Sequence, residues 1–320
     1  MKRIVFILSC LLLIACTSHN YGEVKVNLDK ALRQKTSTQD LYVSAEVLPL
    51  CLPDGVILPD TPHIEVSDSL VFLLDAYGEQ IVVLDTNGSF VRLIGGGMPV
   101  TDFSTYKNQI LDILYGSEVK EYNLDDFSLI REISLPADGV TLTEMQRRDD
   151  DVLWFAGFQG EWAYDCAYYV GRDYFSAVKN PVHKAADYQD QRFFRCNDSS
   201  FFSYRHGVVM AYTSDDFIYP MLILDFGKHS PVVKQAQMTS DRLYLQLDSL
   251  GEEALLVYDR SGEQHRLIKT TSEGLVFPLG IIHKGVNFFC SPARQLDNYL
   301  PPGSVTLPKE TEFILLKFNL

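Results

Sequence analysis

Aromatic and arginine residues are concentrated between Trp154 and Tyr219. Surfaces that recognise proteins or sugars are enriched in these residue types, because they combine a large contact area with hydrogen-bonding groups. The stretch therefore predicts a ligand-binding surface. Its candidate contact residues are the tyrosines and arginines Tyr169, Arg172, Arg192, Arg195, Tyr204 and Arg205. A second interpretation stays open, in which the rings fill a β-sheet core and the arginines pair with the many acidic residues.

Signatures of common catalytic sites are missing from the sequence. It has no GxSxG nucleophile elbow, no HExxH zinc motif, no CxxC pair and no phosphate-binding P-loop. The histidines are scattered, and although His183 and Asp187 lie four residues apart, nothing else there marks a metal site, so we favour a solvated loop. We therefore expect no catalytic residue, no metal and no cofactor, and we favour a non-enzymatic protein while leaving enzyme activity open.

The charge of the chain excludes one class of partner. Lysine and arginine number 28 against 42 acidic residues, which gives a formal net charge of −14. Nucleic-acid binding requires a basic surface that neutralises phosphates. We therefore expect no nucleic-acid partner.

The first residues have the pattern of an export signal. Lys2 and Arg3 precede the apolar run Ile4–Ile14, which is too short to span a membrane and of the right length for a signal peptide. The run ends in Leu13-Ile14-Ala15-Cys16, which resembles the lipobox of bacterial lipoproteins. Residues 1–15 are therefore expected to be a lipoprotein signal peptide.

The lipobox resemblance implies that Cys16 is lipidated and that the membrane is a partner through this anchor. No acidic residue follows Cys16 directly. By resemblance to lipoprotein sorting rules, this implies an outer-membrane lipoprotein that faces the periplasm. Residues 16–44 are polar and mixed without a strand pattern, and we interpret them as a tether.

Cysteines beyond the leader occur at Cys51, Cys166, Cys196 and Cys290. An oxidising compartment permits disulfides, and Cys166 with Cys196 is the best candidate pair because they fall in neighbouring repeat units. The alternative is that they are buried free thiols, since cysteine is a common core residue.

A unit of three short strands occurs at Asp68–Gly95 and recurs along the chain. Turn signals separate its strands, including Asn87-Gly88, whose residues tolerate the positive φ angles of a tight hairpin. Further units begin about every 40 to 50 residues, which is the period of a four-stranded propeller blade. The later units are Asn108–Leu135, one from Asp149, Gly207–Gly227, Ser240–Lys269, and one from Gly280 that ends at Glu312–Phe318.

These repeats predict an all-β fold, a six-bladed β-propeller over residues 45–320. The strand before each unit, such as His63–Val66 or Val140–Gln146, is expected to line the central channel. The last unit lacks an outermost strand, and we expect the run Ala45–Leu50 to close it, which removes a free sheet edge. Two connections are longer than blades need, Asn180–Arg192 and Ser291–Glu310, and long loops on a rigid scaffold often carry function.

The pattern Ile81-Val82-Val83-Leu84-Asp85 followed by Gly88 and Gly95 resembles NHL-type propeller repeats. Together with the lipobox, it is similar to the six-bladed propeller lipoproteins of Bacteroidetes. This resemblance implies the fold and the envelope location, and it implies no common activity.

Two functional interpretations remain. The first is a lipid-anchored binding or scaffold module for a protein, peptide or glycan, with a patch around Tyr169–Arg205 near the channel mouth. The second is a metal-dependent, lactonase-like hydrolase, because gluconolactonase-type propellers hold a metal with acidic and amide side chains in the channel. The channel candidates for such a site are Glu65, Asp102, Glu144 and Gln146. The missing catalytic motifs favour the binding module.

Overall fold

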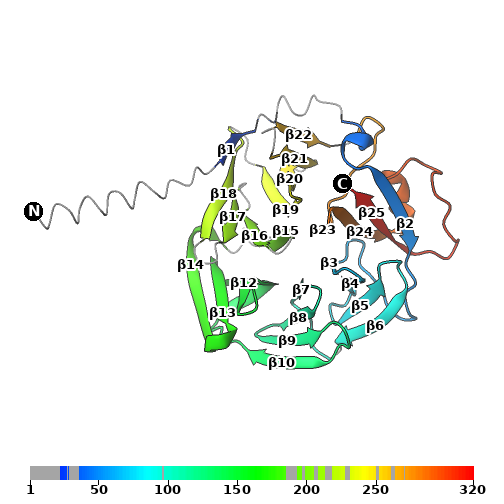
Figure 1. Ribbon diagram of the computed structural model, residues 1–320. Helices are drawn as coiled ribbons and strands as arrows, with labels where there is room; N and C mark the ends of the chain where they lie inside the picture. Colours follow the sequence, from blue (N-terminus) through cyan, green and yellow to red (C-terminus); the bar gives the residue numbers. More distant parts are fainter. Residues whose placement is uncertain are drawn as a thin grey trace, which may run out of the picture.

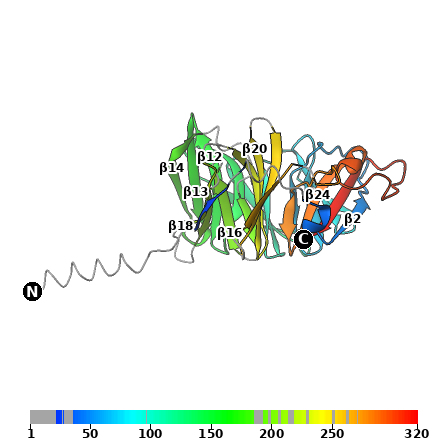
Figure 2. The same ribbon diagram turned by 90° about the horizontal axis from the view of Figure 1, so that it is seen from above.

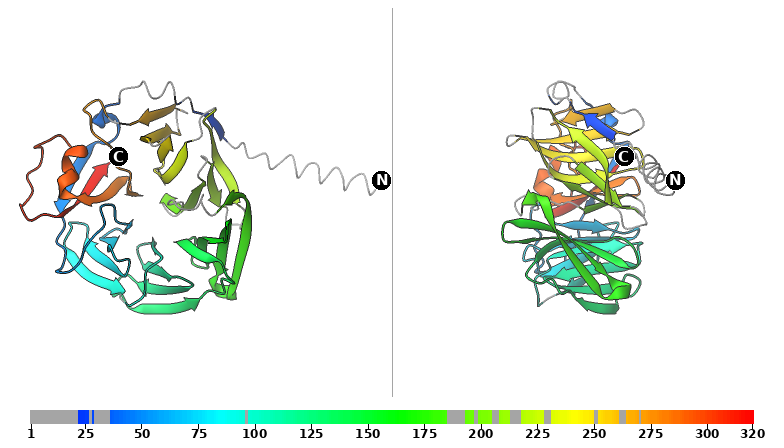
Figure 3. Two further views of the ribbon diagram at one scale, coloured as in Figure 1. Left: turned by 180° about the vertical axis from the view of Figure 1, so that it is seen from behind. Right: turned by 90° about the vertical axis from the view of Figure 1, so that its left-hand side faces the viewer.

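The computed structural model describes residues 22–26, 28, 36–95, 97–184, 193–196, 199–204, 208–212, 218–227, 231–249, 252–260, 264–269 and 271–320. Within these residues the strands form six sheets arranged as blades around a central axis (Figure 1). The view turned by 90° shows a flat disc (Figure 2), and the ring is equally clear from behind (Figure 3). The expected six-bladed propeller is therefore confirmed.

Each blade begins with its innermost strand and steps outward. Blade one has β3 (Ile64–Val66), β4 (Leu70–Leu74), β5 (Gln80–Asp85) and β6 (Phe90–Gly95). Blade two has β7 (Asp102–Tyr106), β8 (Ile110–Tyr115), β9 (Glu118–Asn123) and β10 (Leu129–Ser134). Blade three has β11 (Thr141–Arg147), β12 (Val152–Gln159), β13 (Trp162–Tyr169) and β14 (Tyr174–Lys184).

The other three blades follow the same order, and two of them gain a strand from the N-terminal region. Blade four has β15 (Phe193–Cys196), β16 (Ser199–Tyr204), β17 (Val208–Tyr212) and β18 (Ile218–Asp225), with β1 (Gly22–Lys25) outermost. Blade five has β19 (Val232–Met238), β20 (Arg242–Ser249), β21 (Glu252–Asp259) and β22 (Gln264–Ile268). Blade six has β23 (Ile281–His283), β24 (Val286–Pro292) and β25 (Phe313–Asn319), with β2 (Ser44–Pro49) outermost.

The aspartates that end two strands of blade one fix its turns. Asp75 Oδ1 accepts hydrogen bonds from the backbone N–H groups of Glu79 and Gln80, and Asp85 Oδ1 accepts from those of Asn87 and Ser89. Short acidic side chains stabilise turns in this way. Gly88 has a φ of +84°, and a Cβ there would lie 2.8 Å from the Pro49 carbonyl oxygen, so only glycine fits.

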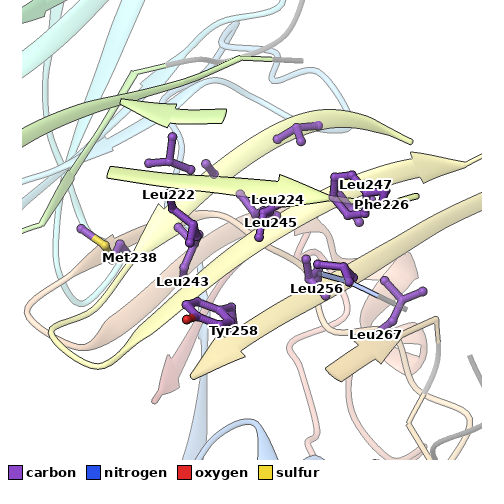
Figure 4. Close-up of a cluster of buried hydrophobic side chains, with 14 of the residues drawn as sticks. Leu222, Leu224, Phe226, Met238, Leu243, Leu245, Leu247, Leu256, Tyr258 and Leu267 are labelled. Carbon is purple, nitrogen blue, oxygen red and sulfur yellow. The ribbon is translucent and has the colours of Figure 1, made fainter. Parts of the chain in front are cut away.

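Apolar clusters fill all six interfaces between neighbouring blades. The cluster between blades four and five is drawn in Figure 4, where leucines from β18, β20 and β21 meet Phe226 and Met238. The aromatic-rich stretch contributes to these interfaces, since Trp154, Phe193 and Phe194 are all buried. The core-filling interpretation is therefore correct for these rings, which pack because half-buried strands favour aromatic side chains.

β2 pairs antiparallel with β25, from Ser44 opposite Asn319 to Pro49 opposite Ile314. The expected closure of the last blade by an N-terminal strand is confirmed. The edge of β25 is thereby covered, as a propeller requires of the blade that holds both ends of the domain.

Residues 16–44 differ from the expected tether, because described parts of this interval belong to the propeller. β1 pairs in parallel with β18, and Val26 and Leu28 are buried in the cluster between blades four and five. Leu41, which follows the 3-10 helix η1 (Thr38–Asp40), is 1% exposed between blades five and six. A four-residue strand is too short to show alternation in sequence, and it forms because the edge of β18 offers free backbone groups.

Three further expectations need correction. The unit placed at Gly207–Gly227 contains only the outer strands of blade four, whose inner strands are β15 and β16. The loop expected at Asn180–Arg192 begins as strand, since β14 runs to Lys184, and its remainder lies outside the described residues. The predicted disulfide is not formed, since Cys166 and Cys196, on the neighbouring blades three and four, are both free thiols, as are Cys51 and Cys290.

The loop from Ser291 to Glu310 contains the 3-10 helix η4 (Ala293–Asn298). Its Leu296 and Leu300 are buried against the interface between blades five and six. Among the described residues, no helix is long and apolar enough to cross a membrane.

Candidate functional site

The innermost strands of the six blades surround a channel that contains two cavities. One has a volume of about 290 Å³ and lies where β7, β15 and β23 end. The other has about 250 Å³ and lies where β7 and β11 begin, so the two open toward opposite faces of the disc. Glu65, Gln146 and Phe193 line both cavities and separate them.

We call the first cavity the basic mouth, because Lys107, Arg195, His283 and Lys284 line it. Its lysines begin two tight hairpin turns, Lys107–Gln109 between β7 and β8 and Lys284–Gly285 between β23 and β24. Lys107, Asn108, Lys284 and Gly285 have positive φ, with Lys107 and Lys284 both at +49°. Lysine adopts this conformation at a cost, and a tight turn holds its side chain at a defined place on the rim.

Acidic residues on the same face partner the rim cations. Lys107 Nζ lies 3.1 Å from Asp150, and Asp68 contacts both Lys284 Nζ at 2.6 Å and His283 Nε2 at 2.8 Å. The hydrogen bonds from Lys284 and His283 lower the pKa of Asp68. These pairs are exposed, and pairs of this kind typically contribute at most about 1 kcal/mol. The rim lysines can therefore exchange partners readily.

Arg195 lies deeper in the basic mouth. Its Nη2 donates to the Arg147 carbonyl oxygen, and its guanidinium lies 4.9 Å from the centre of the Tyr106 ring. Its Nε is buried without a hydrogen-bond partner among the described residues, and burial lowers its pKa. A buried donor left unpaired costs about 1–3 kcal/mol. This nitrogen therefore lacks the hydrogen bond that would offset its burial within the described residues.

A buried charge network stands behind Arg195. The guanidinium of Arg147 binds both oxygens of Asp112, at 2.6 and 2.7 Å, and also contacts Glu121, which Arg131 binds at 3.0 Å from the outer side. Asp112 and Glu121 are cross-strand partners on β8 and β9. The two carboxylates raise the pKa of Arg147, so its charge is permanent. The network holds fixed the carbonyl group that Arg195 contacts.

Two buried amides complete the inner wall of the basic mouth. Gln146 is 5% exposed and Gln237 is 1% exposed. Gln237 accepts a hydrogen bond from the Ile282 N–H, and its Nε2 has no partner in the described part of the chain. Gln146 Oε1 is also without a described partner. The cavity therefore presents one unpaired amide donor and one unpaired amide acceptor beside Arg195.

Glu65 is the acidic group shared by the two cavities. Its Oε2 accepts a hydrogen bond of 3.3 Å from Thr105 Oγ1. Burial raises the pKa of Glu65 to about 7, against a smaller opposing effect from Arg195. The carboxyl group therefore keeps its proton to higher pH than an exposed glutamate, and in its protonated form it can donate as well as accept a hydrogen bond.

We call the opposite cavity the acidic mouth, because Glu65, Asp102 and Glu144 line it together with His63. Asp102 accepts a hydrogen bond of 2.5 Å from the Met145 N–H, and burial, reinforced by Glu144, raises its pKa well above the usual range. His63 Nε2 lies 3.5 Å from Asp102, and burial lowers the pKa of His63 to about 4. Two carboxyl groups with raised pKa values, Glu65 and Asp102, thus lie at this end of the channel.

The channel candidates Glu65, Asp102, Glu144 and Gln146 all line the acidic mouth. Within the described ranges, however, no group of three or more His, Cys, Asp or Glu side chains is placed to hold a metal ion. The arrangement therefore offers acid and base groups without a recognisable metal site.

The predicted ligand-binding residues are only partly brought together. Arg195 lines the channel, whereas Tyr169 ends β13 and Arg172 lies in the following turn η2 (Val170–Arg172), with its guanidinium 5.7 Å from the Tyr169 ring. Tyr169 pairs with Val152 and Arg147 with Leu153, so Tyr169 lies at the same end of blade three as Arg147 and farther from the axis. Tyr204 ends β16. The positions Cys16, Arg192 and Arg205 are outside the described residues.

Sequence reasoning missed Lys107, Gln237, His283 and Lys284. Each lies on an innermost strand or on the turn directly after it. The tight turns at the ends of the predicted inner strands could have identified these residues, because such turns surround the channel in any propeller.

Comparison with known proteins agrees with the architecture. Residues 14–221 match the profile of the DUF5128 family, described as a 6-bladed beta-propeller. The chain belongs to this family. No curated protein matches the sequence.

Two solved structures similar to this family member are of chains from Bacteroides. One is a protein of Bacteroides fragilis described as exported, with 14% identity and a TM-score of 0.70 over 92% of this chain and 98% of that one. Another is a DUF4221 family member from Bacteroides vulgatus, with 8% identity and a TM-score of 0.55 over 87% of this chain and 96% of that one. At such identities the likeness shows the fold, and the predicted resemblance to Bacteroidetes-type propellers is confirmed.

Proposed function

We propose that this propeller is a binding module of the cell envelope, which captures a glycan, peptide or protein at the basic mouth. The observation that supports the proposal is the desolvated guanidinium of Arg195, whose Nε has no described partner. A pocket with a few convergent, unsatisfied polar groups is the usual form of a binding site. The network of Arg147, Asp112 and Glu121 behind it supplies the rigidity that binding requires.

The test applies a glycan array and a peptide library to the full-length protein in detergent, with two alanine variants. Arg195→Ala removes the buried guanidinium, and Arg172→Ala removes the same charge from the exposed outer part of that face. We expect Arg195→Ala to reduce capture at least tenfold and Arg172→Ala to leave it unchanged. Equal capture by both variants, or loss with Arg172→Ala alone, would contradict a site at the basic mouth.

We also propose that Cys16 carries the lipid anchor and places the propeller on the periplasmic side of the outer membrane. The lipobox sequence Leu13-Ile14-Ala15-Cys16 supports this. Metabolic labelling with a fatty acid should modify the wild-type protein and not the Cys16→Ser variant. Equal labelling of both proteins would overturn the assignment.

A second candidate function is hydrolysis in the acidic mouth. It is favoured by the convergence of Glu65, Asp102 and Glu144, since perturbed carboxyl groups in a cleft are typical of acid–base catalysis. A panel of lactones, assayed with and without divalent cations, tests it. If the wild type hydrolyses a lactone and Asp102→Asn does not, the functional site lies in the acidic mouth.

A further inference from the structure

The hydrogen-bond donors in the basic mouth favour a ligand with an anionic group. Arg195 Nε and Gln237 Nε2 are both unpartnered among the described residues and line the same cavity of about 290 Å³. Within those residues Arg195 forms no salt bridge, although the charges of Glu65 and Asp112 act on it at longer range. A guanidinium pairs best with a planar carboxylate, which it can bind through two parallel hydrogen bonds.

The hydrogen-bond acceptors in the same cavity favour a ligand that also carries hydroxyl groups. Gln146 Oε1 has no described partner, and the Glu65 carboxyl group, which lines the cavity, is hydrogen-bonded only by the backbone and side chain of Thr105 among the described residues. An inorganic anion such as sulfate brings acceptors only and would leave the Gln146 oxygen unpaired. A ligand that satisfies both walls must therefore carry a carboxylate and O–H donors together.

The size and lining of the cavity restrict the ligand further. A volume of about 290 Å³ lies at the lower end of the range for small-molecule sites, so one small unit fits rather than an extended chain. The ring of Tyr106 and the side chain of Phe193 supply apolar surface beside the polar groups. A single ring with polar edges and apolar faces matches this lining.

We infer that the basic mouth binds a polyhydroxylated carboxylate, such as a sugar acid, either free or as one residue of a glycan. Arg195 and Gln237 hold the carboxylate, while Gln146 and Glu65 accept hydrogen bonds from the hydroxyl groups. Lys107 and Lys284, released from Asp150 and Asp68, close over the anion at the rim. The inference rests on the proposed binding function and names the ligand class of that site.

The experiment is calorimetric titration of the full-length protein in detergent with glucuronate, glucose and inorganic phosphate. Glucuronate and glucose share their ring hydroxyls and differ in the carboxylate, so their comparison isolates the anion. We expect glucuronate to bind at least tenfold more tightly than glucose or phosphate. A glucuronate-containing oligosaccharide in a parallel titration distinguishes a glycan residue from the free acid, since only a glycan site gains affinity from the neighbouring sugars.

Variants assign the binding to the predicted groups. Arg195→Gln should weaken glucuronate binding at least tenfold, and Gln146→Leu, which keeps the side-chain volume, should weaken it about fivefold. Arg294 lies on η4, is exposed and pairs with Asp60. The variant Arg294→Ala is the control and should bind glucuronate as the wild type does. Thermal unfolding midpoints of all variants establish that they are folded.

The outcomes separate this inference from the proposed function. Equal binding of glucose and glucuronate, tighter binding of phosphate, or an Arg195→Gln variant with normal affinity would overturn the sugar-acid assignment. If no sugar acid binds while array capture still depends on Arg195, the ligand class is wrong and the binding function stands. If Arg195→Ala leaves array capture unchanged, the binding function itself fails.

Discussion

At the scale of single residues, Glu65 makes the stability of the propeller depend on pH. Burial raises its folded pKa from 4.5 to about 7, so between these values the folded protein holds a proton that the unfolded chain has released. Its stabilising contribution is therefore complete below pH 4.5 and is lost as the pH rises through 7, with a slope of at most about 1.4 kcal/mol per pH unit. The charged or titratable groups that share its cavities are Tyr106, Lys107, Arg195, His283 and Lys284 in the basic mouth and His63, Asp102 and Glu144 in the acidic mouth.

We expect Glu65→Gln to flatten this dependence, so that its free energy of unfolding changes less between pH 5 and pH 8 than that of the wild type. Chemical denaturation at both pH values measures the difference. Glu310→Gln, which removes an exposed carboxylate from the loop before β25, is the control and should behave as the wild type. A wild-type slope retained in Glu65→Gln would show that Glu65 is ionised in the folded protein.

Residue composition predicted part of the candidate site. Arg195 was selected because arginine lay among aromatic residues, and the structure places it in the channel. The same criterion selected Arg172, which lies on an outer turn, because composition carries no information on distance from the axis. Lys107 and Lys284 were missed since their significance depends on which turns surround the channel. That information is tertiary and follows only from the register of the blades.

At the scale of elements, the described residues between Gly22 and Leu41 are part of the fold. Leu41 is 1% exposed among Tyr244, Phe318 and other side chains of blades five and six. Leu41→Ala should lower the free energy of unfolding by about 2–5 kcal/mol, because it leaves a cavity in a packed cluster. Denaturant titration measures the change. Val43→Ala, two residues later and 87% exposed, is the matched control and should be near neutral.

A loss below about 0.5 kcal/mol in Leu41→Ala would show that this segment is a tether after all.

The strands of blades one, two and five were predicted from alternation and turn residues, which are local signals. β1 was not predicted, because its partner β18 lies some 200 residues away in the sequence. The inner strands of blade four were not predicted either, since their phenylalanines resemble binding residues as much as core residues.

At the scale of the whole molecule, the pairing of β2 with β25 holds the ring closed. Asn319 Nδ2 donates to Ser44 Oγ at 2.7 Å, so the two side chains face each other across the pair. A disulfide in Ser44→Cys with Asn319→Cys would link the two ends of the propeller and restrict the unfolded chain, which stabilises by at most about 5 kcal/mol. We expect the oxidised variant to unfold at a higher temperature than its reduced form.

Calorimetric unfolding with and without reductant measures this effect, and the wild type, whose described cysteines are free, is the control. An unchanged unfolding temperature on oxidation, with the bond verified by mass spectrometry, would mean that unfolding does not begin at this closure.

The number of blades and the closing strand could both be predicted from the sequence. The repeat period indicates the number of blades, and the missing fourth strand of the last unit indicates that another strand must close it.

The strands that the N-terminal region lends to blades four and six also determine when the protein can fold. β2 is synthesised long before its partner β25, since the paired residues Ser44 and Asn319 are 275 positions apart in the sequence. A chain emerging from the ribosome or from an export channel must therefore keep β2 unpaired until β25 has also emerged. Chaperones that protect exposed strand edges would act throughout that interval. A truncated product cannot close the ring, so proteases would remove incomplete chains and spare complete ones.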